Sequence, residues 1–220
     1  MKKIFTLLFL LFIFILIYIS CNKKHDDTIS IAGTVFDPKI NSYVQDATVS
    51  ILSSRIEDGN YNPNYQVITS TQTDAGGNFS FEFKEEKVIG YRIKISKNLY
   101  FDNTIDIQAD DLSPGETYNP SYHIFPQGFI KLHVKNAIPF DNDDKIAYNF
   151  SDGYLNCMDC CGKDAINGDG MLYEKTTICK TYGNQNVTIS WTVRKNANTF
   201  SNNATIFCLA FDTVSYDINY

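Results

Sequence analysis

Residues 71–83 read Thr-Gln-Thr-Asp-Ala-Gly-Gly-Asn-Phe-Ser-Phe-Glu-Phe, a polar run followed by a tight turn and then by an aromatic residue at every second position. Alternate side chains of a strand face the same side, so Phe79, Phe81 and Phe83 are expected to be buried together. The Asp-Ala-Gly-Gly-Asn segment supplies residues that tolerate the backbone of a hairpin turn. The stretch therefore predicts two antiparallel strands joined at residues 74–78.

The same period of two continues on both sides of this hairpin. Apolar residues alternate with polar ones in several short segments, and no comparable stretch has an amphipathic helical period. An Asn, Gly and Pro cluster at 58–64 predicts a turn, and Pro120 interrupts the last segment. The expected strands are 29–36, 47–51, 67–73, 79–83, 91–95, 104–108 and 118–125. They predict a β-sandwich over residues 29–125.

Three of these segments carry a resemblance to a known family. Residues 31–37 (IAGTVFD), 44–51 (VQDATVSI) and 71–81 together resemble the carboxypeptidase regulatory-like domain, a transthyretin-like β-sandwich. Gly33 permits the close approach of a neighbouring backbone, and Ala47 is a small inward residue. The resemblance implies the fold but no peptidase chemistry, because this module serves as a spacer or docking unit in envelope proteins.

A second β domain is expected over residues 126–220. Clean alternation predicts strands at 130–134, 146–150 and 187–193, and residues 213–220 can close the sheet. Residues 204–211 are apolar on both faces, which is typical of a central strand. The segment 151–186 is interpreted as irregular, and 196–203 as a turn. The whole chain is thus predicted to be all-β, with two sandwiches in tandem.

The first 21 residues predict export from the cell interior. Lys2 and Lys3 precede a run over 4–19 that is apolar except for Thr6 and Tyr18 and is followed by Ser20 and Cys21. This order resembles the signal of bacterial lipoproteins. The resemblance implies a signal peptide over 1–20, lipidation of Cys21 with fatty acids such as palmitate, and a leash over 21–28. An uncleaved membrane anchor is the alternative. In both cases the chain is tethered to a membrane of the cell envelope, with the outer membrane favoured, and faces the periplasm or the cell surface.

Charge and size narrow the classes of partner. Removal of residues 1–20 takes two lysines and shifts the formal net charge from −6 to −8, and leaves 200 of the 220 residues. An acidic chain without a basic stripe is not expected to bind nucleic acid. Two hundred residues are enough for two ordinary β domains.

The five cysteines other than Cys21 all lie in the second domain. They form the one group of residues in the sequence that suggests a chemical function. In an oxidising envelope compartment they are expected to form two disulfides and to leave one thiol, in a pairing that the sequence leaves open. A zinc site requires two pairs of closely spaced ligands, whereas Cys157 and Cys160 supply only one such pair. A redox-active Cys-x-x-Cys pair lies at the start of a helix, whereas this pair lies among loop-forming residues. Both remain alternatives with lower weight. The disulfide candidates are Cys157, Cys160, Cys161, Cys179 and Cys208.

Histidines and acidic loops do not indicate an enzyme. His25 lies on the leash, His133 stands on a polar strand face, and His123 lies near the domain junction, so each is expected to be solvated. The acidic segments 141–144 and 164–170 lack the spacing of a calcium loop and are interpreted as solvated turns. No catalytic residue, metal site or cofactor is predicted.

The expected function is that of a non-enzymatic envelope lipoprotein. Its sandwiches would present loops or edge strands to a partner protein or glycan, with four tyrosines as loop contacts. These are Tyr61, Tyr65, Tyr154 and Tyr173. The alternative is an envelope metal-binding or redox protein built on Cys157, Cys160, Cys161 and Cys179.

Overall fold

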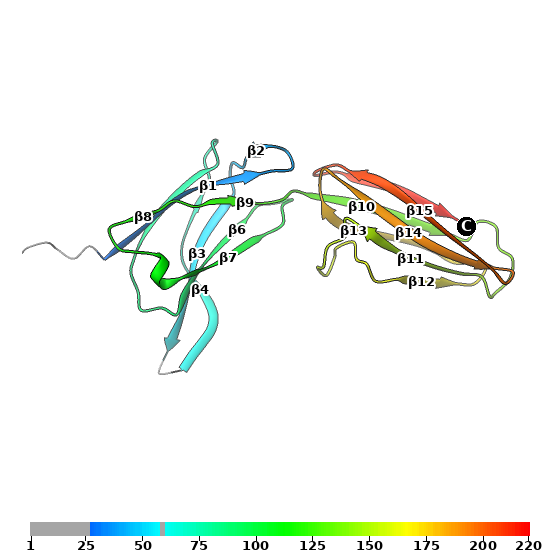
Figure 1. Ribbon diagram of the computed structural model, residues 1–220, viewed down its shortest axis with the longest axis horizontal. Helices are drawn as coiled ribbons and strands as arrows, with labels where there is room; N and C mark the ends of the chain where they lie inside the picture. The colour runs from blue at the N-terminus through cyan, green and yellow to red at the C-terminus, as the bar shows by residue number, and fades with distance from the viewer. Residues whose placement is uncertain (1–26, 58–59) are drawn as a thin grey trace, which may run out of the picture.

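The computed structural model describes residues 27–57 and 60–220, and within them the fold is all-β, as predicted. Two layered bodies follow one another along the chain (Figure 1). The first body also contains one 3-10 turn, η1 (Ala109–Asp111). The strands are β1 (Thr28–Asp37), β2 (Ser42–Tyr43), β3 (Thr48–Glu57), β4 (Asn60–Gln72), β5 (Asn78–Lys84), β6 (Gly90–Ser96), β7 (Asn103–Gln108), β8 (Thr117–Tyr118), β9 (Ser121–His123), β10 (Gln127–Lys135), β11 (Lys145–Asp152), β12 (Ile166–Asp169), β13 (Glu174–Tyr182), β14 (Gln185–Lys195), β15 (Asn198–Cys208) and β16 (Thr213–Asn219).

The first sandwich packs one sheet around β1 against a second sheet in the order β4-β3-β6-β7. β1 pairs antiparallel with β2 and β5 and parallel with β8 and β9. The alternating residues predicted to point inward do so: Phe79 is 4% exposed, and Val49 and Ile93 are fully buried. Apolar burial of this kind is the main stabilising term of the fold.

Three details of the first sandwich differ from the sequence prediction. The strands on either side of the 74–78 turn, β4 and β5, are not paired with each other, because the turn carries the chain from one sheet to the other. β4 begins at Asn60 rather than near residue 67, because its pairing with β3 continues through the Asn and Pro cluster by means of two register shifts. Pro120 divides the last expected strand into β8 and β9, since it has no N–H to donate to a sheet. Its carbonyl still accepts a hydrogen bond from the Thr34 N–H at 3.1 Å, across the close approach that Gly33 permits.

The second sandwich packs the sheet β13-β10-β16 against the sheet β12-β11-β14-β15. β10 lies at the centre of the first sheet, antiparallel to β13 and parallel to β16. Its inward residues Ile130, Leu132 and Val134 meet Ile146 and Ile189 of the facing sheet in a core separate from that of the first sandwich. The predicted alternation of β10 and β14 is therefore confirmed.

Three predictions for the second sandwich were wrong. The stretch 151–186 contains β12 and the nine-residue β13. Residues 196–203 are not a turn, because only Asn196 and Ala197 turn the chain, with φ of 46° and 60°, and β15 starts at Asn198. Two consecutive left-handed residues are the signature of a two-residue hairpin. Residues 204–208 form part of an edge strand and not of a central one.

The two sandwiches meet through an aromatic junction. The Tyr182 ring lies 5.1 Å from that of Phe101 and 4.9 Å from that of Phe125, and the Tyr100 ring lies 5.2 Å from that of Phe211. The main chain that connects the two sandwiches is hydrogen-bonded to both of them. The Pro126 carbonyl accepts from the Gly183 N–H at 2.8 Å, and the Gln127 N–H donates to the Leu99 carbonyl at 2.7 Å. The side-chain Nε2 of Gln127, the first residue of β10, donates to the Tyr100 carbonyl at 2.8 Å.

Candidate functional site

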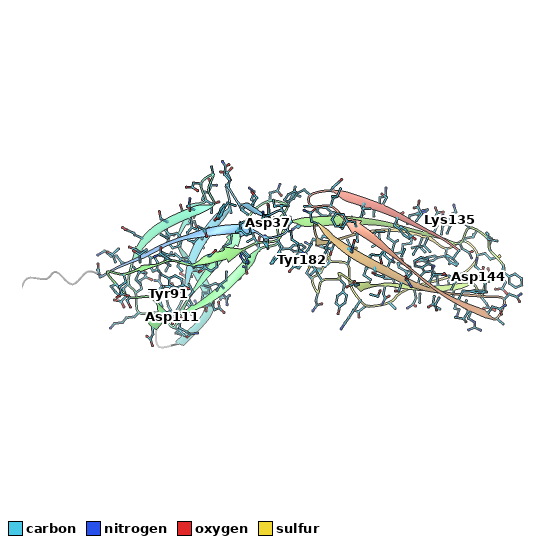
Figure 2. All side chains as sticks on the ribbon, turned by 45° about the horizontal axis from the view of Figure 1, so that its top comes forward. Asp37, Tyr91, Asp111, Lys135, Asp144 and Tyr182 are labelled. Carbon is cyan, nitrogen blue, oxygen red and sulfur yellow. A yellow bond between two sulfur atoms is a disulfide. The ribbon has the colours of Figure 1, made fainter. Side chains whose placement is uncertain are left out.

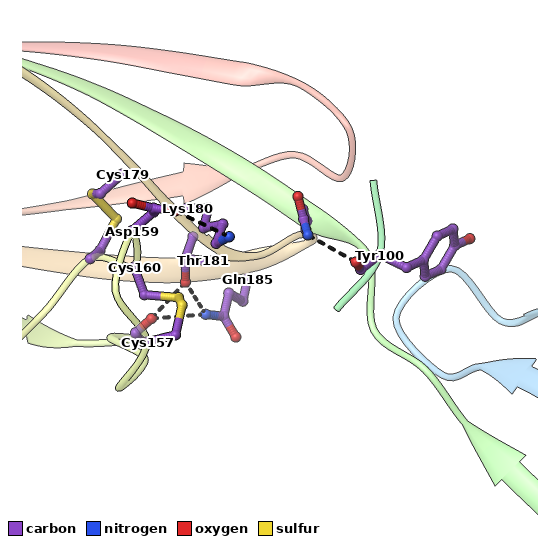
Figure 3. The surroundings of a disulfide bond; sticks show 11 residues. Tyr100, Cys157, Asp159, Cys160, Cys179, Lys180, Thr181 and Gln185 are labelled. Carbon is purple, nitrogen blue, oxygen red and sulfur yellow. Dashed lines mark hydrogen bonds and ion pairs between the residues drawn. A yellow bond between two sulfur atoms is a disulfide. The ribbon is translucent and has the colours of Figure 1, made fainter. Parts of the chain in front are cut away.

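The predicted cysteine cluster folds into two disulfides beside β13 (Figure 3). Cys157 bonds Cys160, and Cys161 bonds Cys179 with a Cα–Cα distance of 4.9 Å. The prediction that disulfides occur here is confirmed, and Cys208 is the free thiol among the five. It is fully buried, and burial raises the pKa of its thiol to about 11. In this oxidised arrangement the four bridged sulfurs are not thiolates, which zinc or a nucleophilic step requires.

The disulfide loop covers the outer edge of β13. The Cys161 N–H donates to the Lys180 carbonyl at 3.0 Å, and the Lys180 N–H donates to the Asp159 carbonyl at 3.0 Å. Below them, the Thr181 hydroxyl donates to the Gly153 carbonyl at 2.7 Å. An uncovered strand edge is a template for pairing with other chains, so this loop removes one such edge from the second sandwich.

The opposite edge of this sandwich, β15, has no such cover among the described residues. β15 is eleven residues long and pairs only with β14. Its core-facing residues oppose buried partners on β14: Ala204 opposes Ile189, and Phe200 opposes Val193. Yet Phe200 is 57% exposed, whereas Val193 is 5% exposed. The facing sheet has three strands against four, so β15 lacks a full partner layer.

β15 also lacks the devices that usually blunt a strand edge. Residues 196–211 contain no charged residue and no proline, and Phe207, Leu209 and Phe211 are 52%, 52% and 40% exposed. Natural edge strands are commonly short or carry lysine or proline, which discourage pairing with another chain. We define the β15 edge as residues 198–208 and treat it as the candidate interface.

The outer face beside this edge is built of small polar side chains. The Thr188 and Thr205 hydroxyls lie 2.9 Å apart, and those of Thr192 and Ser201 lie 3.0 Å apart, each pair joining β14 to β15. Thr192 and Ser201 also line a shallow hollow of about 390 Å³. Cross-strand hydroxyl pairs of this kind hold the register of β15 while its other edge stays open.

A larger hollow of about 660 Å³ lies on the first sandwich beside β1 and β5. Its one carboxylate, Asp74, accepts the N–H groups of Gly76 and Asn78 at 2.8 Å each. The Asn78 bonds hold the pKa of Asp74 below its usual range. Asp74 therefore stabilises the turn between β4 and β5, and its Oδ1 is occupied by these hydrogen bonds.

Several predicted residues lie elsewhere. Cys21 and His25 fall outside the described residues. His133 is on a strand face, where its Nε2 lies 2.9 Å from Glu174, and His123 is exposed at the end of β9. Among the described residues, no three His, Cys, Asp or Glu side chains gather closely enough for a metal ion, and no helix is long and apolar enough to cross a membrane.

The loop predictions need correction. Asp144 is fully buried, so segment 141–144 is not simply a solvated turn. Part of segment 164–170 is β12. Of the four tyrosines, Tyr61 and Tyr65 belong to β4, and the Tyr173 hydroxyl lies 3.2 Å from that of Tyr148, whereas Tyr154 is exposed on a loop. In the sequence, only the lack of charged residues over 196–211 points to the β15 edge.

Comparison with known proteins finds only distant structural similarity. No protein-family model and no curated protein matches the chain. Among solved structures, the Bacillus anthracis TIE protein is 14% identical with a TM-score of 0.36, covering 87% of this chain and 34% of that one. A streptococcal ancillary pilin is 13% identical, with a TM-score of 0.36 and coverage of 90% and 64%. The shaft pilin SpaA of Lactobacillus rhamnosus GG is 8% identical, with a TM-score of 0.32 and coverage of 87% and 96%. The chain thus spans about a third of the first and less than two thirds of the second.

Proposed function

We propose that this chain is a non-enzymatic envelope lipoprotein whose second sandwich binds an extended segment of a partner protein by strand addition along the β15 edge. The observation that carries the proposal is the eleven-residue, uncharged and unpaired edge of β15. Strand addition uses the main-chain groups of such an edge for affinity and the alternate side chains for specificity. Each added hydrogen bond contributes about 0.5–1.5 kcal/mol net.

The contrast between the two edges of the second sandwich supports a binding role. The edge of β13 is covered by a loop that two disulfides hold in place. The edge of β15 is longer and is flanked by exposed Phe200 and Phe207. Since an open edge is a liability for aggregation, its retention beside a covered one favours a selected contact.

The chemistry of the edge defines the occupant. One face of β15 carries Thr199, Ser201, Asn203, Thr205 and Phe207, and the other carries Phe200, Asn202, Ala204 and Ile206. A charged partner strand would find no counter-charge within residues 196–211 and would lose hydration on docking. The partner segment is therefore an uncharged, extended stretch with apolar side chains at alternate positions, carried by another envelope protein.

The tether places this interface away from the membrane. The sequence supports lipid attachment at Cys21, and the leash leads into β1 at Thr28. The first sandwich then separates the tether from the second sandwich, as the order of the two bodies along the chain in Figure 1 shows. The first sandwich acts as a spacer, and the second carries the contact.

The edge is tested by charging it. Asn202→Lys with Asn203→Lys places one lysine on each face of β15 and is expected to abolish capture of the partner when the full chain is crosslinked in intact envelopes. Gln108→Lys, on the exposed end of β7, is the matched control and should leave capture unchanged. Equal capture by all three proteins would exclude the β15 edge, and a crosslink between two copies alone would replace the partner protein by a self-contact.

The tether is tested separately. Cells fed a labelled fatty acid should incorporate label into the wild-type chain and not into Cys21→Ala, and the variant should leave the membrane fraction. Unchanged labelling and fractionation would exclude lipidation at Cys21, whatever the result at β15.

A further inference from the structure

A buried amine, carboxamide and carboxylate meet at the far end of the second sandwich. The Lys195 Nζ donates to the Asn136 Oδ1 at 2.6 Å, and the Asn136 Nδ2 donates to the Asp144 Oδ2 at 2.9 Å. The Lys195 Nζ lies 3.9 Å from the same Asp144 Oδ2. Asn136 follows β10, Asp144 precedes β11, and Lys195 ends β14, so the three come from both sheets of the sandwich. Figure 2 shows Asp144 at this end of the molecule, away from the junction at Tyr182.

The cluster is shielded from water. Asp144 is fully buried, Asn136 is 5% exposed, and the Lys195 side chain is 16% exposed. The Lys195 Nζ lies 4.7 Å from the centre of the Tyr220 ring, which covers it. The Asp144 Oδ1 is buried and has no hydrogen-bond partner among the described residues. A buried carboxylate with an unpartnered oxygen is costly, so it has capacity to accept a proton.

The distances suit a reaction between amine and carboxamide. A carbonyl bond is about 1.2 Å long, so the Asn136 Cγ lies within about 3.8 Å of the Lys195 Nζ. Reacting atoms in a near-attack geometry are about 3–3.5 Å apart, so a small rotation of the lysine brings its nitrogen over the carbon. The Asn136 Nδ2 donates to Asp144 and to the Gly170 carbonyl, and the Oδ1 accepts from Lys195, so both ends of the carboxamide are already oriented.

We propose that Lys195 and Asn136 join in an intramolecular amide bond, formed by the chain itself with Asp144 as the proton carrier. The Lys195 ammonium passes a proton to Asp144, which neutralises two buried charges at once. The free amine attacks the Asn136 Cγ, forming the new C–N bond, and the bond from Cγ to Nδ2 breaks. The attacking nitrogen loses one further proton as it becomes an amide, and Asp144 relays this proton and the one it took first to the departing nitrogen, which leaves as ammonium. No oxidant, reductant or further reactant is needed.

The electrostatics of Asp144 fit its role as the initial base. Burial alone would raise the pKa of this carboxyl, but hydrogen bonds from the Phe140 N–H and the Asn136 amide, with the nearby Lys195, lower it. The group is therefore ionised at neutral pH and can take the lysine proton.

The bond would link the two sheets covalently. Asn136 continues the strand β10, and Lys195 ends β14 of the facing sheet. The disulfides lie toward the junction, so the sandwich would be closed by sulfur near one end and by an amide at the other. A cross-link of this kind resists forces that pull the sheets apart, and it cannot be reduced.

Mass spectrometry of the full chain tests the proposal. After reduction and alkylation, the wild-type protein should be about 17 Da lighter than its composition requires, which is the mass of the lost ammonia. A tryptic digest should contain a branched peptide that carries both residue 136 and residue 195. Lys195→Arg keeps the positive charge but supplies no amine, and it should show neither feature. Lys145→Arg, on the exposed start of β11, is the matched control and should keep both.

A second variant protects the test from failures of folding. Asn136→Asp retains an acceptor carbonyl, and its bond would release water, a loss of about 18 Da, in place of ammonia. Asp144→Ala should stop the reaction. Linear peptides for residues 136 and 195 at full mass in folded wild-type protein would overturn the proposal. These outcomes do not depend on a partner at β15 or on lipid at Cys21.

Discussion

Cys161 and Cys179 join the disulfide loop to β13 at the point where the Cys161 N–H also donates to the carbonyl of the next strand residue, Lys180. One covalent bond and one main-chain hydrogen bond of 3.0 Å thus hold the same contact. The loop held by these two bonds covers the outer edge of β13 at Lys180, so this part of the strand is no longer an open edge. Cys161 therefore belongs to the cluster at 157–161 in the sequence, while its bond stabilises a contact with β13, 18 residues further along the chain.

Removal of this bridge should weaken the second sandwich and uncover β13. The bond closes a loop with a sequence separation of 18, worth about 3 kcal/mol in the chain-entropy estimate. We expect Cys161→Ser with Cys179→Ser to lower the free energy of unfolding by this amount, and the Lys180 amide to exchange its hydrogen faster. Denaturant unfolding and hydrogen exchange measure the two effects. Cys157→Ser with Cys160→Ser opens a separation of three and should cost about 2 kcal/mol. An equal or larger loss there would contradict this ranking.

Cys208 should behave as a thiol that only unfolding exposes. It is fully buried, and burial, with a smaller contribution from Asp212, raises the pKa of its thiol to about 11. A raised thiol pKa leaves the group neutral at pH 7–8, and the thiolate is the reactive form. We expect no labelling of Cys208 by a thiol reagent at pH 8 in the folded protein and full labelling in denaturant. The Cys208→Ala variant identifies the labelled site, and rapid labelling without denaturant would contradict the burial.

The strands that the sequence predicted well are those with one buried face. Alternation identified β1, β5 and β10 because their inward residues are large and their outward residues polar. The tight turn at 74–78 was predicted because its Asp, Gly and Asn residues are specific for such turns. These signals are local, so a single sequence is enough to find them.

The strands that were missed depend on contacts across the chain. β13 carries Thr176 and Thr177 and exposed Ile178, so its alternation is weak, and it is held by β10 and by the Cys161 bridge. β15 begins with polar Asn198 because that end has no facing layer. The cluster of Asn136, Asp144 and Lys195 could not be predicted for a related reason. Its members are far apart in the sequence, and each has the character of an ordinary loop residue.

Gly33 should be intolerant of any side chain. A Cβ at this position would lie 2.3 Å from the Pro120 carbonyl oxygen and 2.9 Å from the Phe79 ring. Overpacking of this kind typically costs about 1–3 kcal/mol, and we expect Gly33→Ala to lower the stability of the first sandwich within that range. Thermal unfolding measures the loss. Gly162→Ala is the matched control, since a Cβ there meets nothing closer than 4.0 Å. Similar unfolding of both variants would show that the β1 contact with the Pro120 segment is loose.

Tyr182 should set the rigidity of the junction. Its ring contacts those of Phe101 and Phe125, and aromatic pairs contribute about 0.5–1.5 kcal/mol each beyond their buried area. Loss of the ring leaves the Tyr100–Phe211 ring pair and a few hydrogen bonds across the junction, and we expect these to be too few to keep the two bodies rigid. We expect Tyr182→Ala to let the two sandwiches tumble separately in nitrogen relaxation measurements, while each core unfolds as before. Tyr154→Ala removes an exposed ring from a loop of the same sandwich and should leave the tumbling unchanged. Joint tumbling of the Tyr182→Ala protein would mean that the hydrogen bonds of Gln127 and Lys39 across the junction suffice to hold the two bodies together.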